Sequence, residues 1–454
     1  MSLAPAGPGG LVASMAPVIG RTGGTWLFAS TSQEEADIAR LAPHGIERNG
    51  ITYRLIDLPA TTHHDHYAVI STGLLMPLFH YLLPLAGSPA FDAEFGRAWE
   101  NYRLVNARYA QAVRRHATNG QPVLVEDVHL MLVASSLRGS VPGAGTAYPL
   151  SYFHHVPWCA PDYFGVLPSA VRAEILAGLL SFDSVGFHCR RWLEAFWACC
   201  ERFLLGVARS GDVVTWQGRR VRLVASRASI DTGAVVGAAA RAPTRQWRQR
   251  FSDIGAGRRL IVRVERADPA KNTVRGLSAY AALLERRPSL AEDTCMLAAL
   301  TPVRTWMPEY RDYLDQCRAI AAAVNEKFAA RPVCLHLGEQ AHAYDHHRAL
   351  GALGAAHTVM VTSTFDGCNL VVMEATAAGG QPTVVLSENT GAYEWFGQQT
   401  LPVNPFDVMG TSEALERALD EDEAVRNARA AALRGAVAAH RPEDWVRDRL
   451  ADLW

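Results

Sequence analysis

The chain alternates short apolar, β-branched runs with longer helical patterns, and this alternation most constrains its fold. The candidate strands are 121–126, 149–154, 184–187 and 221–226 in the first half, and 259–264, 294–300, 332–337, 357–362 and 381–386 in the second. The clearest helical patterns between them are 171–180, 191–205 and 271–287. Strands that alternate with helices of this length are typical of βαβ units and parallel sheets. We therefore predict an α/β fold with doubly wound sheets.

The length of the chain, 454 residues, exceeds what one hydrophobic core usually organises, so we expect two domains. The polar stretch 228–249 separates the two sets of strands and is the expected connection. Ligands of doubly wound folds bind at the carboxyl ends of the strands, which predicts a site facing the interdomain cleft. The final segment, 412–454, has a helical, amphipathic pattern.

Charge and cysteine content exclude several classes of protein. The chain has 44 basic and 45 acidic residues, without the clustered positive charge that a nucleic-acid or membrane-surface site needs. No apolar run reaches the roughly 18 residues of a membrane span, and the start lacks the pattern of a signal peptide. None of the eight cysteines forms a CxxC pair. We expect a cytoplasmic protein with reduced thiols and small-molecule partners.

Two segments that follow apolar strands in the second half carry groups suited to a phosphorylated ligand. VERADPAKN places Arg266 and Lys271 at the mouth of a strand, where two cations suit a departing diphosphate. In STFDGCNLVVMEA, a turn at Asp366 precedes a helix start at Asn369, whose free N–H groups attract phosphate. Glu374 follows in that helix and suits ribose hydroxyls. The alternatives are a solvated basic turn and an ordinary capped helix.

The strand ends of the first half carry an acid and an imidazole, Asp127 and His155, that suit sugar hydroxyls. A purely structural histidine is the alternative. Glycines at 7–10 would let backbone amides approach a phosphate, unless this is only a frayed terminus. The acidic triplet 420–422 fits a solvated helix face, and adjacent residues in the HHDH segment 63–66 cannot all point at one ion. We predict no metal site and no cofactor.

Taken in order, nine segments resemble the trehalose-phosphate synthase family of retaining glycosyltransferases, glycosyltransferase family 20. They are GGL at 9–11, MPLFHY at 76–81, WENYRLVN at 99–106, EDVHL at 126–130, FHHVPW at 153–158, SVGFHC at 184–189, VERADPAKN at 264–272, DGCNLVVMEA at 366–375 and VNPFD at 403–407. The resemblance implies a GT-B fold of two Rossmann-like domains with an interdomain active site. The implied parts are an acceptor-side domain 1–227, a nucleotide-sugar domain 228–437, and a helix 438–454 that crosses back.

The resemblance also implies which residues bind the nucleotide-sugar donor. Arg266 and Lys271 match the diphosphate-binding pair, Asp366 a contact to the sugar hydroxyls, and Glu374 a ribose ligand. The remaining matches are Gly9 and Gly10 in a loop over the donor, and Gly367, Asn369 and Leu370 at the phosphate-binding helix start. The implied catalytic set is Asp127, His155, Arg266 and Lys271.

On the acceptor side, the resemblance comes with departures. His155 matches an imidazole near the reacting centre and Asp127 an acid beside the acceptor, while Tyr67 and Arg304 match acceptor contacts. Met76 stands where the family has a tryptophan that lines the acceptor pocket. Few residues precede the first glycines, so we expect the family's N-terminal strand and its phosphate-binding arginine to be missing. These departures predict an anionic acceptor other than glucose 6-phosphate.

Three further segments resemble natural-product branches of the family. STFDGCNL at 363–370, LSENTGAYE at 386–394 and VPWCAPDYFGVLP at 156–168 are similar to the pseudo-glycosyltransferase that makes validoxylamine phosphate by C–N coupling. The sulfur-glycosyltransferase of lincomycin-type biosynthesis is a second branch to which the chain could belong. Both branches imply a GDP-activated donor and a role in antibiotic biosynthesis.

The predicted function is therefore retaining transfer from a GDP-sugar to an anionic small molecule, with a thiol as one acceptor class. The alternatives are C–N coupling of a GDP-cyclitol to an aminocyclitol phosphate, trehalose phosphate synthesis, and a catalytically dead sugar sensor. A phosphorylase or epimerase on the same architecture has no positive support. The sequence leaves open the acceptor, the donor sugar, the linkage and whether the chain forms a homo-oligomer.

Overall fold

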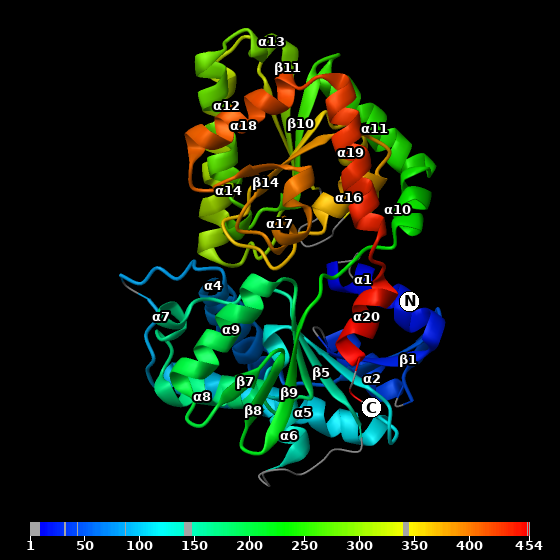
Figure 1. Cartoon of the computed structure of the whole chain (residues 1–454), viewed down its shortest axis with the longest axis vertical. Helices are drawn as coiled ribbons and strands as arrows, with labels where there is room; N and C mark the ends of the chain where they lie inside the picture. Colours follow the sequence, from blue (N-terminus) through cyan, green and yellow to red (C-terminus); the bar gives the residue numbers. More distant parts are fainter. Residues whose placement is uncertain are drawn as a thin grey trace. The chain divides into compact units, whose positions relative to one another are not determined.

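The computed structural model describes residues 10–30, 33–42, 44–86, 88–139, 148–338, 345–451 and 453. The chain forms two compact units (Figure 1). The first unit contains Ala16–Arg227 and the segment from Glu443 onward; the second contains Ala228–Pro442 and the start of helix α1 (Gly10–Thr22) as far as Met15. The chain thus leaves the second unit after Pro442, five residues beyond the expected boundary at 437. None of the described helices combines the length and apolarity that crossing a membrane requires.

The first unit is built on a six-stranded sheet with the order β4-β5-β6-β9-β8-β7. Its strands are β4 (Val123–Glu126), β5 (Leu150–His154), β6 (Ser184–Phe187), β9 (Arg219–Ala225), β8 (Val213–Trp216) and β7 (Ala208–Ser210). The first four run parallel, whereas β8 and β7 add an antiparallel hairpin. Every residue of β5 and β6 is buried, as expected for central strands with both faces covered. The main helices of this unit are α5 (Ala93–His116), α6 (Val133–Arg138), α7 (Pro161–Phe164), α8 (Ser169–Leu179) and α9 (Arg190–Phe203).

A second, three-stranded sheet near the start of the first unit was not predicted from the sequence. Its strands are β1 (Gly24–Ala29), β3 (Ile51–Ile56) and β2 (Ile46–Arg48), in the order β1-β3-β2. Nearly all their residues are only partly buried, so these strands lack the continuous apolar runs that marked the others. Helix α2 (Gln33–Leu41) lies between β1 and β2 in the chain. After β3 come α3 (Ala60–His64), a π-helix η1 (Asp65–Leu75) and α4 (Met76–Phe79).

The second unit has a six-stranded, wholly parallel sheet with the order β12-β11-β10-β13-β14-β15. Its strands are β10 (Arg259–Arg266), β11 (Thr294–Thr301), β12 (Val333–Leu337), β13 (Thr358–Val361), β14 (Thr383–Ser387) and β15 (Leu401–Val403). Alternate residues of β10 face opposite sides: Ile261 belongs to one buried apolar cluster, and Leu260 and Val262 to the other. The carboxyl ends of β10 and β13 are neighbours, which positions the candidate site.

Helices cover both faces of this parallel sheet (Figure 1). On one face lie α12 (Thr273–Arg286), α14 (Pro308–Lys327) and α18 (Val408–Asp420); on the other lie α10 (Thr232–Ala239), α11 (Ala242–Gly255), α15 (His346–Gly354), α16 (Val371–Ala377) and α19 (Glu423–Ala438). Shorter elements are α13 (Leu290–Asp293), α17 (Gly391–Phe396) and η4 (Gly397–Gln399). The polar stretch 228–249, expected as a connection, instead folds mostly into α10 and α11. Phe251 and Trp247 of α11 pack into the core, so most of its polar residues form the outer face of an amphipathic helix.

The last helix, α20 (Pro442–Leu450), packs within the first unit. Ser184 donates a hydrogen bond to the carbonyl oxygen of Arg449 (3.0 Å), and Ser226 donates one to the Asp448 carboxylate (2.7 Å). Trp445 is fully buried, and its ring meets the ring of Phe153 edge to face at a centroid distance of 5.0 Å. This aromatic contact fixes α20 to the end of β5.

We predict that Trp445→Ala lowers the free energy of unfolding of the first unit by about 3–5 kcal/mol, the usual cost of removing a buried tryptophan. Chemical denaturation followed by circular dichroism measures the change. Leu205→Ala is the control, since Leu205 is 96% exposed and its removal should cost less than about 0.5 kcal/mol. Equal stabilities of the two variants would contradict the prediction.

Candidate active site

Lys271 and Asp366, predicted from separate motifs, lie together at the carboxyl ends of β10 and β13. Lys271 ends the short 3-10 helix η3 (Pro269–Lys271), and its Nζ lies 2.5 Å from Oδ2 of Asp366. The side chains are only 15% and 11% exposed, respectively. A lysine held this way stands as a fixed positive charge at the strand ends, where an open α/β sheet binds its ligands.

Asp366 also organises the turn that leads into α16. Besides Lys271, its Oδ2 accepts hydrogen bonds from Ser363 Oγ and Asn369 Nδ2, each at 3.0 Å. Asn369 has a positive φ of 79°, a conformation that asparagine tolerates better than most residues, and its Oδ1 accepts a bond from the Val371 N–H at 3.2 Å. Helix α16 therefore begins at Val371, just after the expected start at Asn369 and Leu370.

The other residues predicted for the donor occupy the same part of the second unit. Gly367 is buried in the turn, and Leu370 is the residue before α16. Glu374 is buried in α16, and its Oε1 lies 3.9 Å from Nδ1 of His346 on α15. Burial lowers the pKa of His346, so its imidazole is neutral near pH 7. Gly10 is the first residue of α1, whereas Gly9 and the residues before it lie outside the described residues. The expectation that the family's N-terminal strand and its arginine are missing therefore stays a prediction.

Asp268 is a residue of this site that the sequence reasoning missed. Its Oδ2 lies 3.8 Å from Nη2 of Arg266 and 3.3 Å from Nη1 of Arg304, and its Oδ1 accepts a hydrogen bond from the Ala270 N–H that begins η3. Arg304, with φ at 49°, also donates to the hydroxyl of Tyr310 at 2.5 Å. One buried carboxylate thus connects the predicted diphosphate cation with the predicted acceptor anchor.

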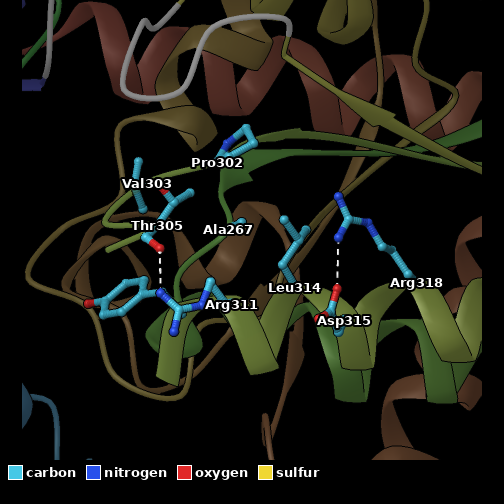
Figure 2. Close-up of a pocket in the computed structure, with 9 residues that line it drawn as sticks. Ala267, Pro302, Val303, Thr305, Arg311, Leu314, Asp315 and Arg318 are labelled. Carbon is cyan, nitrogen blue, oxygen red and sulfur yellow. Dashed lines mark hydrogen bonds and ion pairs between the residues drawn. The ribbon is translucent and has the colours of Figure 1, made fainter. Parts of the chain in front are cut away.

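A pocket lies beside this arginine pair, between the end of β11 and the start of α14. It is lined by Ala267, Val303, Thr305, Tyr310 and Leu314, among others (Figure 2). Its wall is held by a hydrogen bond from Arg311 to the carbonyl oxygen of Thr305 at 3.0 Å. None of the predicted donor residues lines this pocket.

In the first unit, Asp127 follows β4 in a strained backbone conformation. Its φ and ψ are 67° and 176°, a region occupied almost only by glycine. The conformation is held because its N–H donates to the carbonyl oxygen of Phe153 (2.8 Å) and its own carbonyl accepts from Leu130 (3.2 Å). Its Oδ1 is buried without a hydrogen-bond partner among the described residues. Burial raises the pKa of Asp127, but the nearby histidines, His155 foremost, outweigh burial and leave the pKa lowered.

His155 lies next to this acid because β4 and β5 are adjacent and parallel, with Glu126 paired to Phe153. His155 Nε2 lies 2.8 Å from Oε2 of Glu126. The preceding residue, His154, is fully buried and uses both ring nitrogens, toward the Tyr152 hydroxyl at 2.9 Å and the Pro157 carbonyl at 3.2 Å. Of the two adjacent histidines, His154 is therefore structural and His155 is available to the site.

The two predicted acceptor residues of the first unit lie at the ends of the π-helix η1. Tyr67 is 39% exposed and stacks on His129, two residues after Asp127, at a centroid distance of 5.6 Å. Met76 begins α4 and is partly buried. In the HHDH segment, Asp65 accepts a hydrogen bond from Asn101 (2.8 Å), and the described residues contain no group of three or more His, Cys, Asp or Glu side chains placed to hold a metal ion.

Comparison with known proteins was decisive for the family. The sequence pattern described as glycosyltransferase family 20 matches residues 4–454. The chain belongs to glycosyltransferase family 20. It is 32% identical to a trehalose-6-phosphate synthase of Mycolicibacterium gilvum, an alignment that covers 98% of this chain and 88% of the relative. It is 28% identical to a validamine 7-phosphate valienyltransferase of Streptomyces hygroscopicus subsp. jinggangensis, over 99% and 89% of the two chains.

Solved structures support the same assignment. The protein from E. coli bound with UDP-2-fluoro glucose superposes with a TM-score of 0.86 at 25% identity, covering 100% of this family 20 chain and 97% of the other. A trehalose-phosphate synthase from Burkholderia xenovorans in complex with glucose-6-phosphate gives a TM-score of 0.86 at 27% identity, over 98% and 96%. The predicted GT-B fold and glycosyltransferase activity are therefore confirmed. The roles of individual residues stay predictions.

We predict that Asp127→Gly makes the protein more stable and less active. Glycine removes a backbone strain of about 1–3 kcal/mol, against about 0.5–1 kcal/mol of added chain entropy in the unfolded state. Urea denaturation should show a gain of about 1–2 kcal/mol, with a loss of turnover measured in parallel. A less stable variant would contradict the presence of strain at Asp127. An equally active variant would contradict a role of the strain in function.

We predict that the first unit loses stability as the pH falls below about 6.5. Burial lowers the pKa of His66 and of His154 to about 3, so the unfolded chain binds protons between pH 6.5 and 3 that the folded chain does not. Stability therefore rises with pH across this window, by up to about 1.4 kcal/mol per histidine per pH unit. Urea denaturation at pH 7.5 and 5.5 measures the effect.

The control for this pH dependence is His66→Gln, since a glutamine amide can still donate to the carbonyl oxygen of His129 that His66 Nε2 contacts at 2.9 Å. The variant should show a shallower loss between pH 7.5 and 5.5. An unchanged slope would refute the assignment of this loss to His66.

Proposed function

We propose that this family 20 enzyme is a retaining glycosyltransferase that uses a GDP-activated sugar or sugar-like donor and an anionic small-molecule acceptor. The observation that carries the proposal is the Lys271–Asp366 pair at the strand ends, with Arg266 close by in the same unit. These groups supply fixed positive charge where the diphosphate leaves, which is the main task in a reaction whose leaving group carries the developing charge.

The proposed mechanism needs no strong base among the protein side chains. The acceptor attacks from the face on which the diphosphate departs, and one diphosphate oxygen takes the acceptor's proton. The bond from the sugar carbon to the diphosphate oxygen breaks with both electrons going to the diphosphate. Lys271 and Arg266 stabilise that charge, while His155 and Asp127 orient the sugar and the nucleophile.

The choice of GDP rests on the resemblance of segments 363–370 and 386–394 to natural-product enzymes, together with the similarity to the valienyltransferase. The similarity to a protein bound with UDP-2-fluoro glucose favours UDP as the competing base. A thermal-shift panel of GDP, UDP and ADP separates the two, because a ligand that binds only the folded state raises its stability by an amount that increases with its affinity. GDP should give the largest shift; a larger shift with UDP would refute the GDP assignment.

The panel is run in EDTA, since we propose that no metal ion is needed. Two cationic side chains already face the predicted diphosphate position. Nucleotide binding that requires added Mg²⁺ would overturn the metal-free proposal.

All eight cysteines are free thiols, and seven are buried, which supports our proposal of a cytoplasmic enzyme.

For the acceptor, we propose that Arg304 binds an anionic group, a carboxylate on a thiol or the phosphate of an aminocyclitol. Asp268 and Tyr310 hold its guanidinium in a fixed position, which lowers the entropy cost of binding an anion.

The second candidate function is C–N coupling of a cyclitol, favoured by the similarity to the valienyltransferase. An unsaturated GDP-cyclitol discriminates, because a true glycosyltransferase should not use it. Efficient trehalose phosphate synthesis would refute the acceptor proposal.

We predict that Lys271→Met lowers kcat by about 10²–10³-fold, the scale observed when a charge-stabilising group is removed. Because this variant leaves Asp366 buried without its cation, Arg266→Gln is tested beside it; Arg266 is 45% exposed, so its loss does not threaten folding. Lys327→Met is the matched control, since Lys327 is 55% exposed, forms a surface ion pair with Glu285 and lies over the ring of Phe328. Near-normal turnover in both the Lys271 and Arg266 variants would refute the proposal that these two residues bind the diphosphate.

A further inference from the structure

Helix α20 contributes a buried cation to the candidate site of the first unit. Arg449 has no exposed surface, and its Nη2 lies 2.8 Å from Oε1 of Glu126. The guanidinium lies over the rings of Phe153 and Trp445, 5.0 Å from each centroid. None of its three nitrogens makes a hydrogen bond of good geometry within the described part of the chain, so its contact with Glu126 is an ion pair. Since a buried cation without a counter-charge is very costly, Glu126 is the group that keeps Arg449 in this position.

Glu126 is shared between this arginine and the predicted catalytic histidine. Oε1 faces Arg449, whereas Oε2 lies 2.8 Å from Nε2 of His155. Burial raises the pKa of Glu126, but the charge of Arg449 and the hydrogen bond with His155 outweigh burial and lower the pKa below its ordinary value. Glu126 is therefore ionised near pH 7, and an ionised carboxylate only accepts hydrogen bonds.

The donor of the Glu126–His155 bond is thus the Nε2–H of the imidazole. In a neutral imidazole that carries its proton on Nε2, Nδ1 has the lone pair and accepts hydrogen bonds. Over the described residues, the ring's other neighbours are Phe153, His188 and Trp445, with centroids 5.1, 5.3 and 5.8 Å away, and no hydrogen bond is made at Nδ1. Aromatic packing fixes the plane of the ring, while Glu126 selects which nitrogen holds the proton.

We propose that Glu126, held by Arg449 of the last helix, is a positioning residue that keeps His155 in the Nε2–H form, so that Nδ1 accepts a hydrogen bond from a hydroxyl of the donor. The inference rests on the proposed function, which places His155 beside the donor sugar. Arg449 and Glu126 together are neutral, so they orient the imidazole without adding net charge beside it. The last helix is in this way a working part of the site.

The protonated nitrogen is read directly by long-range ¹H–¹⁵N spectra of the full chain labelled with ¹⁵N-histidine, at pH 7.5. His155 is assigned among the sixteen histidines by its absence in His155→Gln. We expect a protonated Nε2 and an unprotonated Nδ1. In Glu126→Gln, the amide oxygen turns to Arg449 and its NH₂ faces Nε2, so the proton should move to Nδ1. A protonated Nδ1 in the natural protein overturns the proposal.

Kinetics show whether this proton placement matters. Glu126→Gln should lower kcat/KM for the donor about tenfold, the value of one hydrogen bond, with the acceptor KM unchanged. Arg449→Lys keeps the charge and should retain most activity, whereas Arg449→Met should resemble Glu126→Gln. Arg447→Met on the same helix is the control, because Arg447 is 67% exposed and pairs only with Asp444.

The outcomes separate the two proposals. A reversed proton in Glu126→Gln with unchanged donor kinetics overturns the positioning role. Absence of transfer from any nucleotide sugar refutes the proposed function, while the spectra still decide the Glu126–His155 assignment. Glu126→Gln changes almost no volume, so it remains a valid test if Arg449→Met fails to fold.

Discussion

Neighbouring strands of a parallel sheet must end at the same edge, and the candidate site residues of each unit depend on this constraint. In the second unit, β10 and β13 are adjacent, so Lys271 and Asp366 meet although 95 residues separate them. In the first unit, β4 and β5 are adjacent, and their ends bring Glu126 to His155 across 29 residues. Chemistry-bearing residues placed just after such strands are therefore collected by the backbone itself.

The charges of the site are matched by partners within each unit. Lys271 faces Asp366, Arg266 and Arg304 share Asp268, and Arg449 faces Glu126. Lys271, Arg304 and Arg449 are largely buried, and burying them without a counter-charge would cost several kcal/mol each, whereas Arg266 is 45% exposed. The same carboxylates hold the cations in fixed orientations. Under the proposed function, charges held in this way need little rearrangement when the leaving group departs.

All nine strands that the sequence predicted are present, and their bounds agree within a few residues. Buried parallel strands have continuous apolar sequences. The strands β1, β2, β3, β7 and β8 are partly exposed, so their apolar sequence patterns are weaker. For the same reason α11 was not predicted as a helix, because the polar residues of its exposed face resemble those of a connecting segment. For the site, residue type and spacing indicated the candidates, but not their partners. Asp268 and Arg449 became visible only through contacts formed by folding.

The path of the chain has a consequence for how the protein is made. The hydrogen bond between Ser226 and Asp448 closes the first unit across 222 residues of intervening chain. At a synthesis rate of about 5–20 residues per second, roughly 10–45 s pass between the two residues leaving the ribosome's active site. Throughout that interval the surface that Trp445 and Arg449 will cover, around Phe153 and Glu126, has no partner. The first unit, still without its last helix, must therefore stay free of aggregation while the second unit is being translated.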